Sequence, residues 1–182
     1  YDGSSWSEVN DLNTARRGMA GIGLYNAALS ASGWVTTALA NNESWDGTNW
    51  TEVADLNTAR LLHAGSGADS TSALAFGGQP AIANNESWNG SAWTEVNELN
   101  TGRNALGGTG QTNTAAMCVT GQTPSPPVTS LTEIWNGTSW GNWSEYSGTF
   151  NLSGFVNGST IHIEVFAEDH LNQSSSTLNQ TF

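Results

Sequence analysis

Short runs of alternating apolar and polar residues, separated by glycine turns, recur along the first 140 positions of the chain. In the middle of the chain, Ala73-Leu74-Ala75-Phe76 ends at Gly77-Gly78. Farther on, Asn85-Glu86-Ser87-Trp88 and Trp93-Thr94-Glu95-Val96 flank the pair Asn89-Gly90. Asn-Gly pairs favour the positive φ angles of tight hairpin turns. With one more apolar run ahead of them, these segments predict four short β-strands.

The same order of residues returns at a spacing of about 45 residues. Tryptophan marks it at positions 6, 50, 93 and 140, and arginine marks it at positions 16, 60 and 103. Four strands in a repeat of this length match the size of one propeller blade.

The order of arginine, apolar run, Glu-x-Trp, turn and tryptophan resembles the kelch repeat. The segments Trp135-Asn136-Gly137-Thr138-Ser139-Trp140 and Glu8 to Arg16 are similar to kelch-like arrays in structural proteins of marine bacteriophages. This resemblance covers residues 1 to about 140 and implies an all-β fold of kelch-type β-propeller blades. It implies little about function, because propellers serve many roles. The glycine doublet Gly77-Gly78 is replaced by Ser32-Gly33 and Thr120-Gly121 in the other repeats.

The repeats predict blade periods at about residues 7-50, 51-93 and 94-140, with residues 1-6 as the end of a preceding blade. Propellers typically close with 4–8 blades, so three and a fraction units fall short of a ring. The chain is a fragment of a longer protein, or blades from several chains close together, or the array stays open. We favour the first explanation.

From about residue 141 the repeat stops. Residues 149–155 and 160–167 alternate as half-buried strands do, and Asn157-Gly158 between them predicts a turn. The segment 163–174 is similar to the last strands of a fibronectin-III-like or Ig-like module. Such a sandwich takes about 100 residues, so residues 141-182 are expected to form a partial β-sandwich-like segment.

The net charge of the chain limits the kinds of molecule that it can bind. The chain has 16 acidic residues, 4 basic residues and a net charge of -12. It cannot offer the basic patch that nucleic-acid binding requires, and anionic membrane surfaces are disfavoured for the same reason. The sequence has no apolar run long enough to span a bilayer, and its single cysteine, Cys118, excludes an intrachain disulfide. We therefore expect no nucleic acid and no membrane insertion.

The conspicuous polar and aromatic residues recur in register with the repeat. An active site usually occurs once, whereas a residue present in every repeat is needed by the fold of the repeat. Because a buried unpaired charge is costly, each arginine is expected to lie between blades and to meet a carboxylate or backbone carbonyls. A repeated ligand-binding role is the alternative, and for the tryptophans packing is favoured over a binding platform. The structural residues are Arg16, Arg60, Arg103, Glu43, Glu86, Glu133, Trp50, Trp93 and Trp140.

Loops on a rigid scaffold often carry function. Trp34 departs from the repeat, because Gln79 and Gln122 stand at its position, and it is expected in the loop between the second and third strands. Packing is an equal alternative for this residue. The candidates for ligand or receptor contact are Trp34, Val35, Gln79, Pro80, Ile82, Pro124, Pro126 and Pro127.

No pattern of catalytic or metal-binding residues emerges. The histidines His63, His162 and His170 have no metal-ligand spacing, and the sequence has no Cys-x-x-Cys and no phosphate loop. We also find no off-repeat pair of carboxylates of the kind that a glycoside hydrolase uses. The sequence therefore predicts no catalytic residue, metal or cofactor, and a protein that is not an enzyme.

Asn-x-Ser/Thr sequons are frequent, and all five asparagines after residue 141 begin one. They make N-glycosylation a hypothesis and would favour a glycosylating cell surface over a bacteriophage. The candidate sites are Asn42, Asn49, Asn85, Asn89, Asn136, Asn142, Asn151, Asn157, Asn172 and Asn179.

These features predict a non-catalytic, surface-displayed structural or adhesive protein, such as a phage virion or tail-fibre component that presents loops to a host surface. The expected partners are other virion or filament subunits and a host-surface glycan or protein. The chain is expected in a homo-oligomer or larger assembly, on a virion or at the cell surface. The alternatives are a glycosylated extracellular filament or cell-surface glycoprotein, a glycan-active propeller enzyme and an intracellular kelch adaptor.

Overall fold

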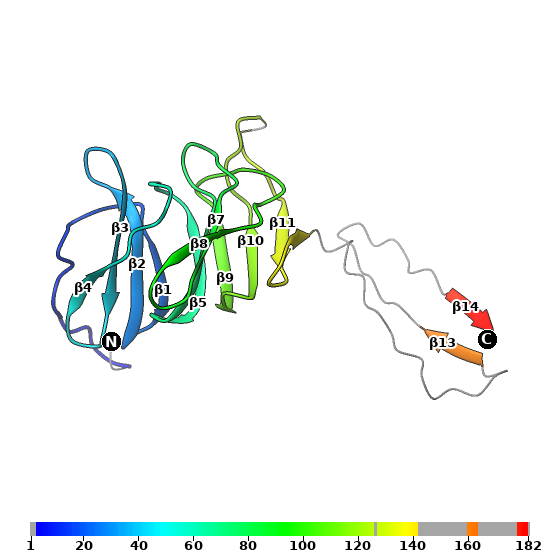
Figure 1. The fold of residues 1–182 in the computed structure, drawn as a ribbon, viewed down its shortest axis with the longest axis horizontal. Coiled ribbons are helices and arrows are strands. Elements are labelled where there is room, and N and C mark those ends of the chain that lie inside the picture. The colour runs from blue at the N-terminus through cyan, green and yellow to red at the C-terminus, as the bar shows by residue number, and fades with distance from the viewer. Residues whose placement is uncertain (1–2, 126, 142–159, 164–177, 182) are drawn as a thin grey trace. The chain divides into compact units, whose positions relative to one another are not determined.

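The fold is seen in a computed structural model that describes residues 3–125, 127–141, 160–163 and 178–181. Within these ranges the regular structure is β-strand, with no helix. The strands of the repeat region form three four-stranded antiparallel sheets, each built from four consecutive strands (Figure 1). Among the described residues these three sheets do not close into a ring.

The strand bounds follow the repeat. Sheet 1 contains β1 (Ala20–Leu24), β2 (Ala27–Trp34), β3 (Ala38–Trp45) and β4 (Trp50–Val53). Sheet 2 contains β5 (Ala64–Asp69), β6 (Ser72–Phe76), β7 (Asn85–Trp88) and β8 (Trp93–Val96). Sheet 3 contains β9 (Gly107–Thr112), β10 (Ala115–Val119), β11 (Thr132–Trp135) and β12 (Trp140–Gly141).

The chain divides into two compact units, Tyr1–Trp143 and Ser144–Phe182. In the second unit, β13 (Thr160–Ile163) pairs antiparallel with β14 (Leu178–Thr181). The strand predicted at 149–155 and the turn at Asn157-Gly158 lie outside the described residues. So does the part of the predicted strand 160–167 that follows Ile163. The sandwich-like tail therefore stays a prediction.

Hairpin chemistry explains why the third and fourth strands of each sheet pair. In sheet 1, the Asp46 carboxylate accepts hydrogen bonds from the backbone N–H groups of Thr48 and Asn49. Gly47, with φ of 96°, supplies the left-handed turn residue. Asn89 and Asn136 repeat this geometry in the other two sheets. Each turn places two tryptophans opposite each other, at centroid distances of 5.3, 5.3 and 5.5 Å for the pairs Trp45–Trp50, Trp88–Trp93 and Trp135–Trp140.

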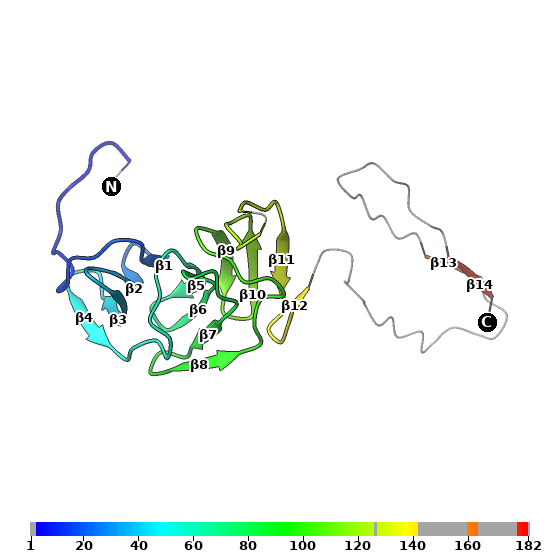
Figure 2. The ribbon, with the colours of Figure 1, turned by 90° about the horizontal axis from the view of Figure 1, so that it is seen from above.

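The sheets stack face to face, and their first strands lie next to one another, β1 beside β5 and β5 beside β9 (Figure 2). The contact between sheets 1 and 2 is apolar, with Ile22 and Leu29 on one side and Ala73, Trp88 and Trp93 on the other. Sheets 2 and 3 repeat it with Leu74 and Phe76 against Ala116, Trp135 and Trp140. The core therefore lies between sheets, so a sheet depends on its neighbour for burial.

Two details differ from the sequence-based expectation. The repeat places Trp6 where Trp50, Trp93 and Trp140 begin a fourth strand, yet residues 3 to 16 contain no strand. A strand needs a neighbour to pair with. This segment instead leads into sheet 1, where Asn10 and Asn13 donate side-chain hydrogen bonds to the carbonyls of Thr48 and Trp50. Trp34 was predicted in a loop, but it is the last residue of β2 and pairs with Ala38. The second and third strands of sheet 1 are longer than those of the other sheets, which brings Trp34 into the strand.

Backbone strain at the end of β10 leads to a stability prediction. Thr120 has φ of 55°, where Gly77 has φ of 70° at the same place in sheet 2. A β-branched residue in this region is an outlier, and left-handed geometry costs an L-residue about 1–2 kcal/mol. Part of that is offset because glycine loses more entropy on folding. Thr120→Gly is expected to raise the melting temperature by about 2–4 °C in a thermal unfolding scan.

Thr132→Gly is the matched control. Thr132 is exposed and is the first residue of β11, where it pairs with Val119. Glycine has no conformational advantage there and weakens the strand, so this variant should unfold at a lower temperature. A fall in melting temperature for both variants would contradict the strain at Thr120.

Candidate functional site

An arginine–glutamate ion pair recurs in each of the three sheets. Arg16 meets Glu43, Arg60 meets Glu86, and Arg103 meets Glu133, with side chains almost closed to solvent. Each arginine ends the segment that leads into a sheet, and each glutamate lies on the third strand of that sheet. The three pairs therefore fasten the connecting segments to the sheets that follow them.

Neighbours engage most of the remaining polar atoms of these pairs, although the Nε atoms of Arg60 and Arg103 are buried without a hydrogen-bond partner among the described residues. Asn57 donates from its backbone N–H and its side chain to the second oxygen of Glu86, at 2.7 and 2.8 Å. Arg60 donates to the carbonyl oxygens of Gly77 and Asn84, at 3.2 and 2.9 Å. Asn13 and Asn100 make the same contacts to Glu43 and Glu133. Such a network has little capacity left for a ligand.

Burial and charge act against each other in this network. Burial alone would raise the pKa of Glu43, but the hydrogen bonds from Asn13 and Thr14 and the charge of Arg16 outweigh it and lower the pKa. Burial lowers the pKa of Arg60, and the Glu86 carboxylate opposes that shift. Both groups need their partner in order to stay charged inside the protein.

His63 forms a buried contact that the sequence did not reveal. Its Nδ1 lies 3.2 Å from the hydroxyl oxygen of Ser32, and both side chains are buried. Burial, with a smaller contribution from Arg60, lowers the pKa of His63 to about 3. The imidazole is therefore neutral at pH 7. Ser32 and His63 come from different repeats, so no local motif could have paired them.

The other reactive side chain is also enclosed. Cys118 is fully buried on β10. Burial raises its pKa to about 12. Since the thiolate is the reactive form of cysteine, this thiol is inert at neutral pH.

The structure places the loop candidates on one end of the sheets. The loops that follow β2, β6 and β10 all lie at the upper end of the sheets in Figure 1. Trp34, Gln79 and Gln122 occupy equivalent positions and form backbone bridges to Arg17, Leu61 and Asn104.

The loop candidates differ in the exposure of their side chains. The Trp34 ring is half-buried, and the Arg17 guanidinium lies 4.2 Å from its centroid. Ile82 is half-buried, and its carbonyl accepts a hydrogen bond from Arg103. Pro126 lies outside the described residues. The exposed candidates are Val35, Gln79, Pro80, Pro124 and Pro127.

The sequons fall into different environments. Asn42 and Asn85 are buried, at 0% and 1% exposure. The side-chain nitrogen of Asn42 donates to Ala40 and Ala54, and that of Asn85 donates to Asn97. N-glycosylation of these two residues is incompatible with the folded sheets, because the nitrogen that would carry a glycan is enclosed.

The other sequons stay open to modification or are not described. Asn49, Asn89 and Asn136 are exposed in hairpin turns. Asn179 lies on β14. The positions outside the described residues are Asn142, Asn151, Asn157 and Asn172.

Among the described residues, no group of three or more His, Cys, Asp or Glu side chains is arranged to hold a metal ion. In the same part of the chain, no helix has the length and apolar character to cross a membrane.

Comparison with known proteins bears on the fold. No protein family matches the sequence, and no curated protein does either. Among solved structures, one described as the structure of YjhT matches with a TM-score of 0.61 and 14% sequence identity. The match covers 71% of this chain and 45% of that chain, so this chain spans less than half of its length. At this identity the likeness shows an all-β fold with several four-stranded antiparallel sheets.

Proposed function

We propose that the three sheets are kelch-type propeller blades and that the chain is a non-catalytic, surface-displayed scaffold. In this role it holds the loops after β2, β6 and β10 outward, as a virion, tail-fibre or extracellular filament component, to contact a glycan or protein on a host surface. The observation that carries the proposal is the contrast between repeated buried ion pairs and dissimilar exposed loops at one end of the sheets.

Several features support this division of labour. The ion pairs and tryptophan pairs are the same in every sheet, as expected of a rigid scaffold. The loops lengthen from residues 35–37 to 77–84 to 120–131, and the last two have in common only the Gly-Gln pair at Gln79 and Gln122. They expose Val35 at 40% and Val128 at 68%. Apolar side chains exposed on loops suit a contact surface.

The test is a loop variant that leaves the sheets intact. A triple variant, Val35→Ser, Gln79→Ala and Val128→Ser, removes one exposed side chain from each loop. Its binding to intact host cells and to a glycan array is expected to fall about tenfold or more, since truncating central contact residues costs about 2 kcal/mol. Its melting temperature should not change.

Tyr25→Ser is the matched control. Tyr25 is 92% exposed but lies in the turn between β1 and β2, at the opposite end of the sheets. This variant should bind as the unaltered chain does. Equal binding by the triple variant and the unaltered chain would refute the contact role of the loops.

A further inference from the structure

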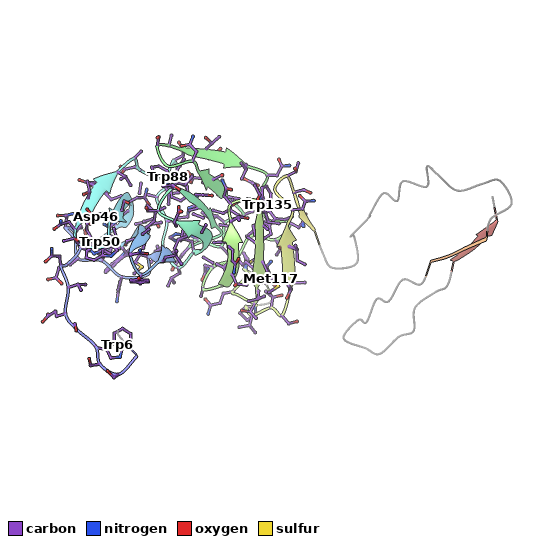
Figure 3. All side chains as sticks on the ribbon, turned by 90° about the horizontal axis from the view of Figure 1, so that it is seen from below. Trp6, Asp46, Trp50, Trp88, Met117 and Trp135 are labelled. Atoms are coloured by element: carbon purple, nitrogen blue, oxygen red, sulfur yellow. The ribbon has the colours of Figure 1, made fainter. Side chains whose placement is uncertain are left out.

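The hairpin turns that join the third and fourth strands have the same geometry in all three sheets but not the same first residue. Asp46 begins the turn of sheet 1 that leads to Trp50 (Figure 3), whereas Asn89 and Asn136 begin the turns of sheets 2 and 3. In each turn the side-chain Oδ1 accepts hydrogen bonds from the backbone N–H groups two and three residues further on, at 2.7 to 3.0 Å. A carboxylate forms these contacts as an amide does, so the turn does not need the side-chain nitrogen of the two asparagines.

Both asparagine turns are open to solvent. Residues 89–92 and 136–139 are all exposed. Sheet 2 packs against a sheet on either side, so the exposure of its turn is a property of the turn and not of an uncovered sheet. Water and hydroxide therefore reach the side-chain amide at both positions.

Each of these asparagines is followed by glycine, with φ of 93° at Gly90 and at Gly137. A glycine has no side chain to obstruct its own backbone nitrogen as that atom approaches the Cγ of the preceding asparagine. Among the described residues, no hydrogen bond holds the backbone N–H of Gly90 or Gly137. This nitrogen can therefore lose its proton to hydroxide and act as a nucleophile.

The turn also supplies the electrophile. Two N–H groups directed at one carbonyl oxygen stabilise the negative charge that this oxygen gains when a nucleophile adds to its carbon. The backbone N–H groups of Ser91 and Ala92 donate to Oδ1 of Asn89 at 2.9 and 3.0 Å. The turn at Asn136 has the same pair of donors, both at 2.9 Å. The fold therefore favours attack on the side-chain amide of both asparagines.

We infer that Asn89 and Asn136 deamidate in the folded chain and that the main product is aspartate, the residue that sheet 1 has at this position. First, the deprotonated backbone nitrogen of Gly90 bonds to Cγ of Asn89, and the bond from Cγ to Nδ2 breaks. Nδ2 leaves as ammonia, and a succinimide ring remains. Water then adds to Cγ, the bond from Cγ to the Gly90 nitrogen breaks, and this nitrogen regains its proton. The net change converts an amide and water into a carboxylate and ammonium, and Asn136 reacts with Gly137 in the same way.

The donors of the turn direct the second step to aspartate. Water can open the ring at either of its two carbonyl carbons. Attack at the backbone carbonyl gives isoaspartate, which adds a methylene to the backbone between the paired residues Trp88 and Trp93. Attack at Cγ leaves the backbone unchanged. Because the N–H groups of Ser91 and Ala92 face the oxygen on Cγ in the turn, they favour the attack that gives aspartate.

Sheet 1 shows why the product persists. The backbone N–H groups of Asn49 and Thr48 lower the pKa of Asp46 in the equivalent turn. An ionised carboxylate is a poor electrophile, so aspartate in this turn does not return readily to the succinimide. Each conversion adds one negative charge to the net charge of -12. These turns lie at the end of the sheets opposite the loops after β2, β6 and β10.

The test follows the folded full chain, produced without glycosylation, during incubation in mildly alkaline buffer. A glutamate-specific protease releases residues 87–95 and 134–145, and tandem mass spectrometry measures amide, aspartate and isoaspartate in each peptide. Aspartate should exceed isoaspartate at least about tenfold, because one oxyanion donor changes a rate by about a hundredfold or more. A parallel sample in urea should give mainly isoaspartate at all three Asn-Gly pairs of the sequence, Asn157-Gly158 included.

Two variants isolate the role of the turn. Asn89→Asp is the product itself, and its melting temperature should be no lower than that of the unaltered chain. Ser91→Pro removes one of the two N–H donors to residue 89, so the share of isoaspartate there should rise about tenfold. Asn136 in the same molecule is the control, because it should still yield aspartate as long as the sheets stay folded.

Three results would overturn the inference. The first is that both asparagines remain amides in the folded chain after the urea sample has reacted, since the turn would then protect them. The second is isoaspartate as the main product in the folded chain. The third is a marked loss of stability in Asn89→Asp. None of these measurements involves the loops or host cells, so the inference stands or falls independently of the proposed display role.

Discussion

Arg60→Ala is expected to lower the free energy of unfolding by about 3–5 kcal/mol, the cost of removing one partner from a buried ion pair. For a chain of 182 residues this corresponds to a fall in melting temperature of roughly 10 °C. The reason is the partner that remains. Glu86 is 0% exposed, and without the guanidinium its charge stays buried with only the Asn57 and Thr58 donors. Chemical and thermal unfolding followed by circular dichroism would measure the effect.

Two variants separate burial of charge from loss of contact. Arg17→Ala removes an exposed arginine whose main contact is the Trp34 ring, so it should cost less than about 1 kcal/mol. The double variant Arg60→Met with Glu86→Leu replaces the pair by apolar groups and should recover much of the stability lost in Arg60→Ala. If Arg60→Ala and Arg17→Ala were equally stable, the ion pair would not hold the sheet to its connecting segment.

Lowering the pH is expected to reduce the free energy of unfolding already at pH values above those at which carboxylates titrate. The cause is protonation of His63 in the unfolded chain. Its pKa is about 3 in the folded chain and near 6.5 when unfolded. Since the folded pKa is depressed, the unfolded chain binds the proton first as pH falls. The stability is fully present above pH 6.5 and declines toward pH 3. The loss approaches about 1.4 kcal/mol per pH unit once the pH is well below 6.5, which gives about 2 kcal/mol between pH 6.5 and 4.5.

The matched variant is His63→Gln, which retains a polar side chain that does not titrate. Its free energy of unfolding should be nearly independent of pH between 6.5 and 4.5, whatever its absolute stability. Below that window both proteins should lose stability, since the lowered pKa of Glu43 adds a carboxylate contribution that fades as this group is protonated. His162 and His170 are present in both proteins and cancel in the comparison. Identical slopes above pH 4.5 would show that His63 is not the responsible group.

Both predictions concern the middle sheet, where the polar network is enclosed on two sides. The Arg60 guanidinium forms an ion pair with Glu86, and its positive charge also lowers the pKa of His63. The same guanidinium thus stabilises one ionised group and opposes the ionisation of another. In Arg60→Ala the pKa of His63 should rise, so the acid sensitivity of that variant should be smaller.

Much of the fold could be predicted because the repeat presents the same local chemistry three times. Asn-Gly and Asp-Gly turns, period-two alternation and the returning tryptophans specify strand pairs without reference to distant residues. The recurrence of arginine and glutamate pointed to a structural role, and the structure places them within hydrogen-bonding distance. The ends of the strands were harder to predict, because the presence of a strand at Trp34 and its absence at Trp6 depend on pairing partners.

The candidate site was less accessible to sequence reasoning. Asn42 and Asn49 both begin sequons, yet one faces a closed contact between strands and the other an exposed turn. His63 showed no partner in the sequence, because Ser32 reaches it from another sheet. A motif consists of residues that are near each other along the chain, whereas Asn42 donates to a carbonyl 12 residues away and His63 contacts a hydroxyl 31 residues away.

By itself, the sequence determined the period of the repeat, the four strands within it and the places of arginine, glutamate and tryptophan. These follow from backbone preferences and alternation, which act over a few neighbouring residues. Only the tertiary structure decided which equivalent positions are covered. The side chain of Ile22 fills the space beside Gly65, whereas the space beside Gly21 is empty among the described residues, although the two glycines occupy the same position of the repeat. Burial is a property of the neighbouring surface, so equivalent positions of similar repeats differ in energy when, among the described residues, only one of them has a neighbouring sheet.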